Sequence, residues 1–470
     1  MLQKGLFVYK IVIHRNILSM AQIFDLSKLL AETSSISLKK QAEIVFKLSI
    51  PGMLAQISSI LMQYIDAAMV GSLGPSQSAA IGLVASSTWV IGSLIHACCI
   101  GFTVQVAHAV GAGEKNKVKQ IFVNSLAVCM GFSCFMALAG ALLSRSLPLW
   151  LGAGHEIYKD AFWYFLIFSL SSPLFEIVYL MSGMLQCSGN MKFPGILNGA
   201  MCFFDMGFNW LFIFGLNMGV KGAALGSCAA AFLTALIMAF YTLFRSEYFC
   251  LKGYKDFSLD GDCIKKAVKM AVPVGLESSA FSGALVVVTR IISPLGAVSL
   301  AANSFATTAE SLCYMPGYGI QEAATTLVGQ SCGAKRPDLK RSFSWITIIY
   351  GMTIMALIGG VMYFACPLVF KFITPDLEIQ ALSVKVLRIE LFAEPLFGAS
   401  IVAAGALRGR GDTLIPSALN LFSLWIVRLS LSLILVKPFG LAGIWIAMAA
   451  ELCFRGLVLL IRVAVTNKYD

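Results

Sequence analysis

Charged residues are scarce in this sequence. Lys, Arg, Asp and Glu make up 13% of the 470 residues, whereas they make up roughly a quarter of an average soluble domain. Apolar residues account for 58%, and the mean hydropathy is +0.82. Twelve apolar stretches of about 20 residues fit along the chain, and each is long enough to cross a bilayer. They begin near residues 46, 83, 120, 161, 194, 220, 268, 303, 343, 382, 415 and 440. The sequence therefore predicts an all-α membrane protein with twelve transmembrane helices.

Several motifs of enzymes and metal sites are also absent. No C-x-x-C pair occurs among the 13 cysteines, so the sequence indicates neither a disulfide framework nor a zinc site. We interpret the cysteines as small, reduced packing residues. No H-E-x-x-H sequence, P-loop or phosphate-binding glycine loop occurs. ATP-driven transport within this chain is therefore not supported. We also expect neither enzyme activity nor a cofactor.

Basic residues outnumber acidic ones, and the formal net charge is +11. Because a nucleic-acid partner would also explain such a charge, the positions of the basic residues matter. With both chain ends placed inside, the inner loops carry 21 Lys or Arg residues and the outer loops carry 6. This asymmetry is the positive-inside pattern of membrane proteins. It explains the charge without a nucleic acid, and it predicts a multi-pass protein of the cytoplasmic (inner) membrane with both termini in the cytoplasm.

The chain repeats itself at an offset of 222 residues. Pro51 pairs with Pro273, and 183-GMLQCSGNMKFPGILN-198 pairs with 405-GALRGRGDTLIPSALN-420 without a gap. Shared glycines and prolines are stronger signs of a repeat than shared apolar residues, which any membrane segment supplies. The repeat predicts two lobes of six helices each. Because six is even, both lobes enter the membrane in the same direction, as in transporters built from parallel repeats.

The repeat also sets the expected domain boundaries. We expect a polar N-terminal segment at residues 1–45, a first lobe at 46–245, a cytoplasmic linker at 246–266, a second lobe at 267–463 and a tail at 464–470. Two rigid lobes around a central cavity suit alternating access by rocking. The sequence therefore favours a transporter over a channel.

In several segments the chain resembles a known family, the multidrug and toxic compound extrusion (MATE) transporters. The motifs that carry the resemblance are Pro51, 66-DAAMVGSLG-74, 212-FIFGLNMGVKGAALGS-227, 295-LGAVSLAAN-303, 329-GQSCGAK-335 and 405-GALRGRGDT-413. The resemblance implies a twelve-helix, two-lobed exporter that couples the entry of Na⁺ or H⁺ to the expulsion of small organic, often amphipathic cationic, compounds. We expect it to act in the lipid bilayer as a monomer.

Four polar residues of the first lobe are predicted to converge. Asp66 lies about five residues inside the outer end of its span, Asn209 about six and Ser227 about seven, so at 1.5 Å per residue their depths agree within a few ångströms. Asp205 lies one turn deeper than Asn209 on the same helix face. Asp66, Asp205 and Asn209 are candidate Na⁺ ligands, because hard cations take oxygen ligands. Two carboxylates at one site can equally share a proton. In a third interpretation, Asp66 only pairs with an Arg or caps a broken helix.

The family comparison adds to this site. Family members often carry Asn and then Asp, four residues apart, where this sequence carries Asp205 and then Asn209. They also often carry Thr where Ser227 stands. Pro51, fifteen residues before Asp66, matches the family proline at which the first helix bends. We therefore hypothesise that protonation or Na⁺ binding at Asp66 rearranges the first helix and releases substrate outward.

The second lobe carries its acids at other positions. The 222-residue offset places Val288 opposite Asp66, so the two lobes differ in chemistry. The candidate second-lobe acidic site comprises Glu277, Glu310, Glu390 and Glu394. In sodium-coupled family members the corresponding acids align with Phe281 and Phe397, about one turn from two of these glutamates. The four carboxylates could bind a second cation or balance the charge of a substrate, and the sequence leaves both interpretations open.

Two other functions fit parts of the sequence. A flippase for lipid-linked oligosaccharides would keep the fold, because such proteins belong to the same wider superfamily. Their cavities tend to be cationic, whereas the charge within the spans here leans acidic. An intramembrane aspartyl protease would use Asp66 and 409-GRGD-412. However, Asp412 is expected in an inner loop and Asp66 near the outer face, which separates the two carboxylates.

Overall fold

The computed structural model describes residues 36–254 and 257–469, and the regular structure within these ranges is helical. The helices of the first half are α3 (Leu38–Gly71), α4 (Pro75–Gly111), α5 (Lys115–Leu143), α6 (Leu147–Trp150), α7 (His155–Leu170), α8 (Ser172–Cys187), α9 (Lys192–Trp210), the π-helical η1 (Leu211–Gly215) and α10 (Gly219–Phe244). Those of the second half are α11 (Gly261–Ile292), the 3₁₀-helical η2 (Ser293–Leu295), α12 (Ala297–Gly333), α13 (Pro337–Ile373), α14 (Leu377–Leu391), α15 (Glu394–Gly409), α16 (Leu414–Phe422), the π-helical η3 (Ser423–Arg428), α17 (Leu429–Phe439) and α18 (Leu441–Tyr469).

These helices account for twelve membrane-spanning segments. In the described part of the chain, nine helical runs are long and apolar enough to cross a membrane, and α7 with α8 forms a further span that is bent by 44°. The two remaining segments, α12 and α14 with α15, are more polar and carry Glu310, Glu390 and Glu394. Every predicted span start lies within eight residues of a helix start. The prediction of an all-α membrane protein with twelve transmembrane helices is confirmed.

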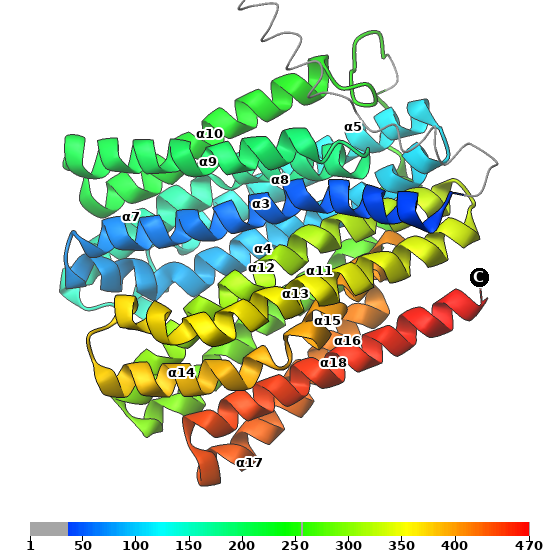
Figure 1. The fold of residues 1–470 in the computed structure, drawn as a ribbon. Coiled ribbons are helices and arrows are strands. Elements are labelled where there is room, and N and C mark those ends of the chain that lie inside the picture. The colour runs from blue at the N-terminus through cyan, green and yellow to red at the C-terminus, as the bar shows by residue number, and fades with distance from the viewer. Residues whose placement is uncertain (1–35, 255–256, 470) are drawn as a thin grey trace, which may run out of the picture.

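The helices form two lobes that follow the chain order. In Figure 1, α3 to α10 occupy one half of the molecule and α11 to α18 the other. The most extensive contacts between the lobes join α3 with α12 and α4 with α11. Each lobe therefore presents its first two helices to the other, as the two-fold repeat requires. The connection between the lobes runs from the end of α10 at Phe244 to the start of α11 at Gly261.

The lobes meet tightly at the end of the molecule that carries the basic loops, which we call the inner end. There a Cβ atom on Gly111 would lie 2.0 Å from the backbone oxygen of Gln330, and one on Gly333 would lie 1.9 Å from that of His108. Only glycine allows backbones to approach this closely. His108 also bonds across the lobes, because its Nε2 lies 2.7 Å from the Gly409 backbone oxygen. Glycine packing therefore closes the inner end.

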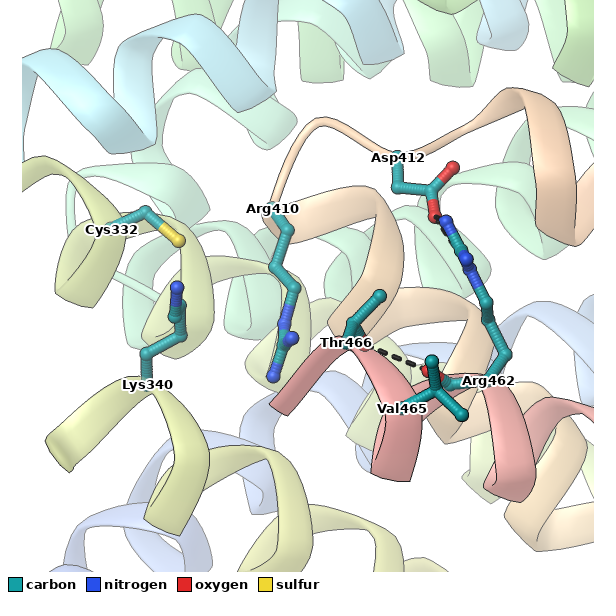
Figure 2. Close-up of a pocket in the computed structure, with 7 residues that line it drawn as sticks. All are labelled: Cys332, Lys340, Arg410, Asp412, Arg462, Val465 and Thr466. Carbon is teal, nitrogen blue, oxygen red and sulfur yellow. Dashed lines mark hydrogen bonds and ion pairs between the residues drawn. The ribbon is translucent and has the colours of Figure 1, made fainter. Parts of the chain in front are cut away.

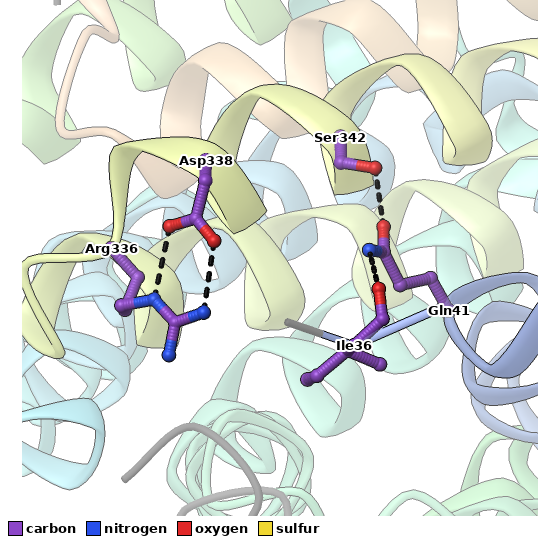
Figure 3. A network of polar contacts seen from close by, with 5 residues as sticks. All are labelled: Ile36, Gln41, Arg336, Asp338 and Ser342. Carbon is purple, nitrogen blue, oxygen red and sulfur yellow. Dashed lines mark hydrogen bonds and ion pairs between the residues drawn. The ribbon is translucent and has the colours of Figure 1, made fainter. Parts of the chain in front are cut away.

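The start of α3 is tied to the second lobe at the same end (Figure 3). Gln41 Nε2 donates a hydrogen bond to the Ile36 backbone oxygen at 2.7 Å, and the Ser342 hydroxyl of α13 donates to Gln41 Oε1. Close by, Arg336 pairs with Asp338 at 2.9 Å at the beginning of α13. Since α3 carries Asp66 near its other end, these contacts anchor the helix that presents the first candidate site residue.

Candidate functional site

The two aspartates of the first lobe are joined by one asparagine. Asn209 Nδ2 donates a hydrogen bond to Asp66 Oδ1 at 2.8 Å and another to Asp205 Oδ2 at 2.9 Å. Asp205 and Asn209 are four residues apart on α9, so they project from one face and meet Asp66 on α3. Asp205 is 0% exposed and Asn209 is 1% exposed, while Asp66 is partly exposed. Asp66 is therefore the most exposed of these three residues.

The fourth predicted residue lies at the same place. Ser227 of α10 is adjacent to the Asp205 carboxyl group. Its neighbour Gly226 packs against Asn209, since a Cβ atom on Gly226 would lie 1.9 Å from Asn209 Oδ1. The π-helix η1 begins two residues after Asn209, and π-helical turns often occur at functional sites. The fold thus gathers Asp66, Asp205, Asn209 and Ser227 from three helices.

The polar atoms of this site are not fully paired. Both N–H groups of the Asn209 amide are used by the aspartates. Buried Asp205 Oδ1 and Asn209 Oδ1 have no hydrogen-bond partner in the described structure, and no ion pair within that part joins either aspartate to a basic side chain. Two carboxylates in a low-dielectric interior repel each other. A Na⁺ ion or a proton between them would remove that repulsion.

Pro51 lies within α3, which is continuous from Leu38 to Gly71. Its side chain packs against α9, because a Cβ atom on Gly195 would lie 2.8 Å from Pro51 Cβ. Proline cannot donate the backbone hydrogen bond that this position of a helix normally makes. The one helix that carries Asp66 is therefore weakened at its contact with the helix that carries Asp205 and Asn209.

Three of the four predicted second-lobe acids come together. Glu310 of α12, Glu390 of α14 and Glu394 of α15 are buried within electrostatic range of one another. Both carboxylate oxygens of Glu390 and of Glu394 lack a hydrogen-bond partner among the described residues. Arg428 of η3 lies close enough to act on Glu310 and Glu390. The break between α14 and α15 thus places two unpaired glutamates in the interior of the lobe.

Glu277 has a separate environment. Its carboxylate accepts hydrogen bonds from Ser417 at 2.6 Å, from Asn420 at 2.7 Å and from Arg408 at 3.2 Å. The ion pair with Arg408 offsets the charge of this carboxylate, and the two further donors satisfy its hydrogen bonding. The structure therefore does not place Glu277 in the group formed by Glu310, Glu390 and Glu394. This difference could not be read from the sequence, since Arg408, Ser417 and Asn420 lie more than a hundred residues from Glu277.

Asp412 lies in the turn between α15 and α16 and pairs with Arg462 of α18 at 2.8 Å. This pair borders a hollow of about 410 Å³ at the inner end, lined also by Lys340 and Arg410 (Figure 2). Asp66 lies near the other end of α3, so the carboxylates of Asp66 and Asp412 lie at opposite ends of the molecule and cannot act as a catalytic pair. The alternative of an intramembrane aspartyl protease is wrong.

Sequence reasoning missed three further buried residues. Glu451 of α18 is fully buried, accepts a hydrogen bond from Ser423 at 2.6 Å and pairs with Arg455 at 3.2 Å. Gly226 supports Asn209, as described above. Glu176 of α8 is also fully buried. A charge inside an apolar span marks the two glutamates in the sequence, whereas nothing in the sequence distinguishes Gly226 from the other membrane glycines.

Comparison with known proteins identifies this architecture. The MatE family profile matches residues 51–211 and again residues 273–434. The chain belongs to the MatE family. The two matches begin 222 residues apart, at Pro51 and Pro273, which is the offset of the internal repeat. MatE proteins are transporters rather than enzymes, and the predicted absence of enzyme activity is thereby confirmed.

Curated relatives and solved structures agree with the MatE assignment. A probable multidrug resistance protein NorM from Thermotoga maritima is 28% identical over 431 residues, covering 89% of this chain and 91% of that protein. A protein of the same name from Burkholderia pseudomallei is 28% identical over 439 residues, covering 90% of this chain and 89% of that protein. An outward-facing multidrug resistance MATE transporter of the MOP superfamily superposes with a TM-score of 0.87 at 20% identity, covering 93% of this chain and 99% of the other.

A MOP-superfamily transporter from Pyrococcus furiosus has the same fold, with a TM-score of 0.86 at 19% identity, covering 93% and 99% of the two chains. That transporter is described as having a binding pocket of reversed polarity that suggests a different function. At this identity the likeness establishes the fold alone.

Proposed function

We propose that this MatE protein is a secondary active multidrug exporter. It exchanges amphipathic organic cations for Na⁺ or H⁺ by alternating access, and the coupling ion binds at Asp66, Asp205, Asn209 and Ser227. We further propose that the protein is a monomer of the cytoplasmic (inner) membrane with both termini in the cytoplasm. The NorM relatives support the multidrug activity, and the predicted distribution of basic loops supports the orientation.

One observation carries the coupling site. Asn209 donates to Asp66 and to Asp205, and two buried oxygen atoms beside these bonds lack partners. With the Ser227 hydroxyl, the group offers carboxylate, amide and hydroxyl oxygens, the donors that a hard cation takes. The same pair of carboxylates can hold one proton between them. Binding either ion changes the charge of the site, and that change is what transport requires.

Contacts of α3 can pass this change to the second lobe. Tyr64 lies two residues before Asp66, and its hydroxyl donates to the Thr308 backbone oxygen of α12 at 2.5 Å. A rearrangement of α3 at Asp66 would therefore alter a contact between the lobes. Alternating access needs such a link, because an ion can shift a conformational equilibrium only if it binds the two states differently.

The second-lobe glutamates supply the proposed counter-charge. Glu310, Glu390 and Glu394 are buried, and four oxygen atoms of the last two are unpaired. This group can bind a second cation or balance the charge of a cationic substrate, while Arg428 and Arg455 limit its net charge. The flippase alternative favours cationic groups for lipid-linked sugars, and the first-lobe site offers it none.

Transport into everted membrane vesicles tests the proposal. A Na⁺ gradient and a pH gradient are imposed separately, and a fluorescent organic cation should accumulate under the gradient of the coupling ion but not under the other. Vesicles that lack the protein are the control. Accumulation that needs neither gradient, or accumulation only of a lipid-linked sugar, would contradict ion-coupled multidrug export.

Packing behind Asn209 gives a second test. Gly226→Ala should displace the Asn209 side chain, because the new Cβ would lie 1.9 Å from its Oδ1. Losing a hydrogen bond to a charged group costs about 1.5–3 kcal/mol, so the ion concentration for half-maximal transport should rise by about tenfold or more.

Gly207→Ala is the matched control for this test. It lies on α9 between Asp205 and Asn209, and its Cβ would meet no atom within 4 Å. Gly207→Ala should transport like the unaltered protein at every ion concentration. Equal ion dependence of the two variants would show that Asn209 is not part of the coupling site.

A further inference from the structure

A cluster of thiols and one carboxylate lies inside the first lobe, apart from the coupling site. Cys98 and Cys99 belong to α4, Cys129 to α5 and Glu176 to α8. The Sγ atoms of Cys98 and Cys129 are 3.6 Å apart, and Cys99 Sγ donates a hydrogen bond to Glu176 Oε1 at 2.9 Å. One ligand atom from each of Cys98, Cys129 and Glu176 fits within 4.8 Å of the other two. Three helices therefore converge on these groups.

The carboxylate of this cluster is incompletely satisfied. Glu176 is 0% exposed, and its Oε2 atom has no hydrogen-bond partner among the residues that the structure describes. None of the ion pairs in that part of the chain includes Glu176. An unpaired carboxylate in a membrane interior is costly and marks a site that binds a cation or a proton. The neighbouring thiols decide which cation would fit.

We propose that Cys98, Cys129 and Glu176 form a binding site for a thiophilic divalent cation of the Zn²⁺ or Cd²⁺ type. Thiolates favour such ions over Na⁺, Mg²⁺ or Ca²⁺. In a tetrahedral zinc site with Zn–S bonds of about 2.3 Å, two sulfurs stand about 3.8 Å apart. The observed separation of 3.6 Å between the two Sγ atoms matches that geometry without a change of backbone.

Charge and hydrogen bonding assign a role to each group. The ion binds the Cys98 and Cys129 sulfurs and Glu176 Oε2, and each of the two thiols releases its proton on binding. The Cys99 thiol keeps its proton and its hydrogen bond to Glu176 Oε1, which holds the carboxylate in place. Two thiolates and one carboxylate leave a net charge of −1 around a divalent ion, and the Cys99 donor disperses part of it.

The cluster lies close to the interface between the lobes. Gly101, three residues after Cys98, contacts the second lobe, since its Cβ would lie 2.1 Å from the Ala267 backbone oxygen of α11. A bound ion would tie α4 to α5 and α8 one turn from this contact. Binding should therefore stabilise the first lobe, because an ion that binds only the folded state raises the stability of that state.

The experiment uses the purified full chain titrated with Cd²⁺. Binding should produce the ultraviolet charge-transfer band of Cd²⁺–thiolate bonds, saturating at about one ion per chain, together with a rise in Tm. The double variant Cys98→Ser/Cys129→Ser should lose the band and the rise in Tm. Glu176→Gln should weaken binding at least about tenfold. Cys134→Ser is the matched control, because this exposed cysteine lies on α5 outside the cluster.

Alkylation of the unaltered protein gives a result that does not depend on the folding of variants. Saturating Cd²⁺ should protect Cys98, the partly exposed thiol of the pair, from a small membrane-permeant alkylating reagent, as measured by mass spectrometry, and should leave the exposed Cys134 reactive. Absence of the charge-transfer band, a band that survives in the double variant, unchanged affinity in Glu176→Gln or equal alkylation of Cys98 with and without Cd²⁺ would each overturn the proposal.

Discussion

Asp66→Asn is expected to abolish ion-driven export while leaving the protein folded in the membrane. The substitution keeps the shape of the side chain and removes its charge, which leaves Asp205 as the sole carboxylate beside Asn209. Removing one partner from a buried charged pair costs about 2–5 kcal/mol, so affinity for the coupling ion should fall by about 30-fold or more. The measurement is the initial rate of substrate accumulation in everted vesicles under the gradient that drives the unaltered protein.

Glu156→Gln is the matched control for Asp66→Asn. Glu156 lies exposed in the first turn of α7, so removing its charge should leave transport unchanged. Both variants should reach the membrane in the amount of the unaltered protein. Normal ion-driven transport by Asp66→Asn would exclude Asp66 from the coupling site and would contradict the proposed mechanism at its first step.

Gly333→Ala is expected to block transport by a different route. Its new Cβ would lie 1.9 Å from the His108 backbone oxygen, and a backbone atom cannot turn aside as a side chain can. Overpacking of this kind costs about 1–3 kcal/mol, so the state with a closed inner end should become about 5- to 150-fold less populated. Pulsed electron paramagnetic resonance between labels at positions 117 and 341, both exposed near the inner end, should report a longer distance.

Gly131→Ala supplies the comparison for Gly333→Ala, because a Cβ at this position of α5 would meet no atom within 4 Å. It should leave the label distance and transport unaltered. If Gly333→Ala also left the distance between the labels unaltered, the glycine contact between α4 and α12 would not control closure of the inner end. Asp66→Asn and Gly333→Ala should differ in this measurement, since Asp66→Asn should leave the inner end able to close.

Much of the fold could be predicted because the bilayer imposes a strong constraint on the sequence. A segment within hydrocarbon must be apolar and must satisfy its own backbone, so length and hydropathy locate helices. The two spans that are less apolar than the others, α12 and α14 with α15, carry Glu310, Glu390 and Glu394. The positions of Asp66, Asn209 and Ser227 along their helices were enough to predict a common depth, because each residue adds a fixed rise.

Contacts between distant segments could not be predicted in the same way. Depth alone did not reveal that Asn209 donates to both aspartates, nor that Gly226 packs behind it. Glu277 and Glu310 look alike in the sequence, yet one is held by Arg408, Ser417 and Asn420 and the other lies with unpaired glutamates. The rotation of each helix about its axis decides which residues become partners. The apolar residues of these helices do not mark one face clearly, so that rotation could not be predicted from the sequence.

By itself, the sequence determined that this protein crosses the membrane twelve times in two repeated lobes with an acid near the outer end of the first span. Those features follow from local rules of solvation, helix rise and internal repetition. Only the tertiary structure decided that one asparagine joins two aspartates, that glycines close the inner end, and that three thiols meet Glu176. The residues of these groups come from separate helices, and packing at distances of a few ångströms is what brings them together.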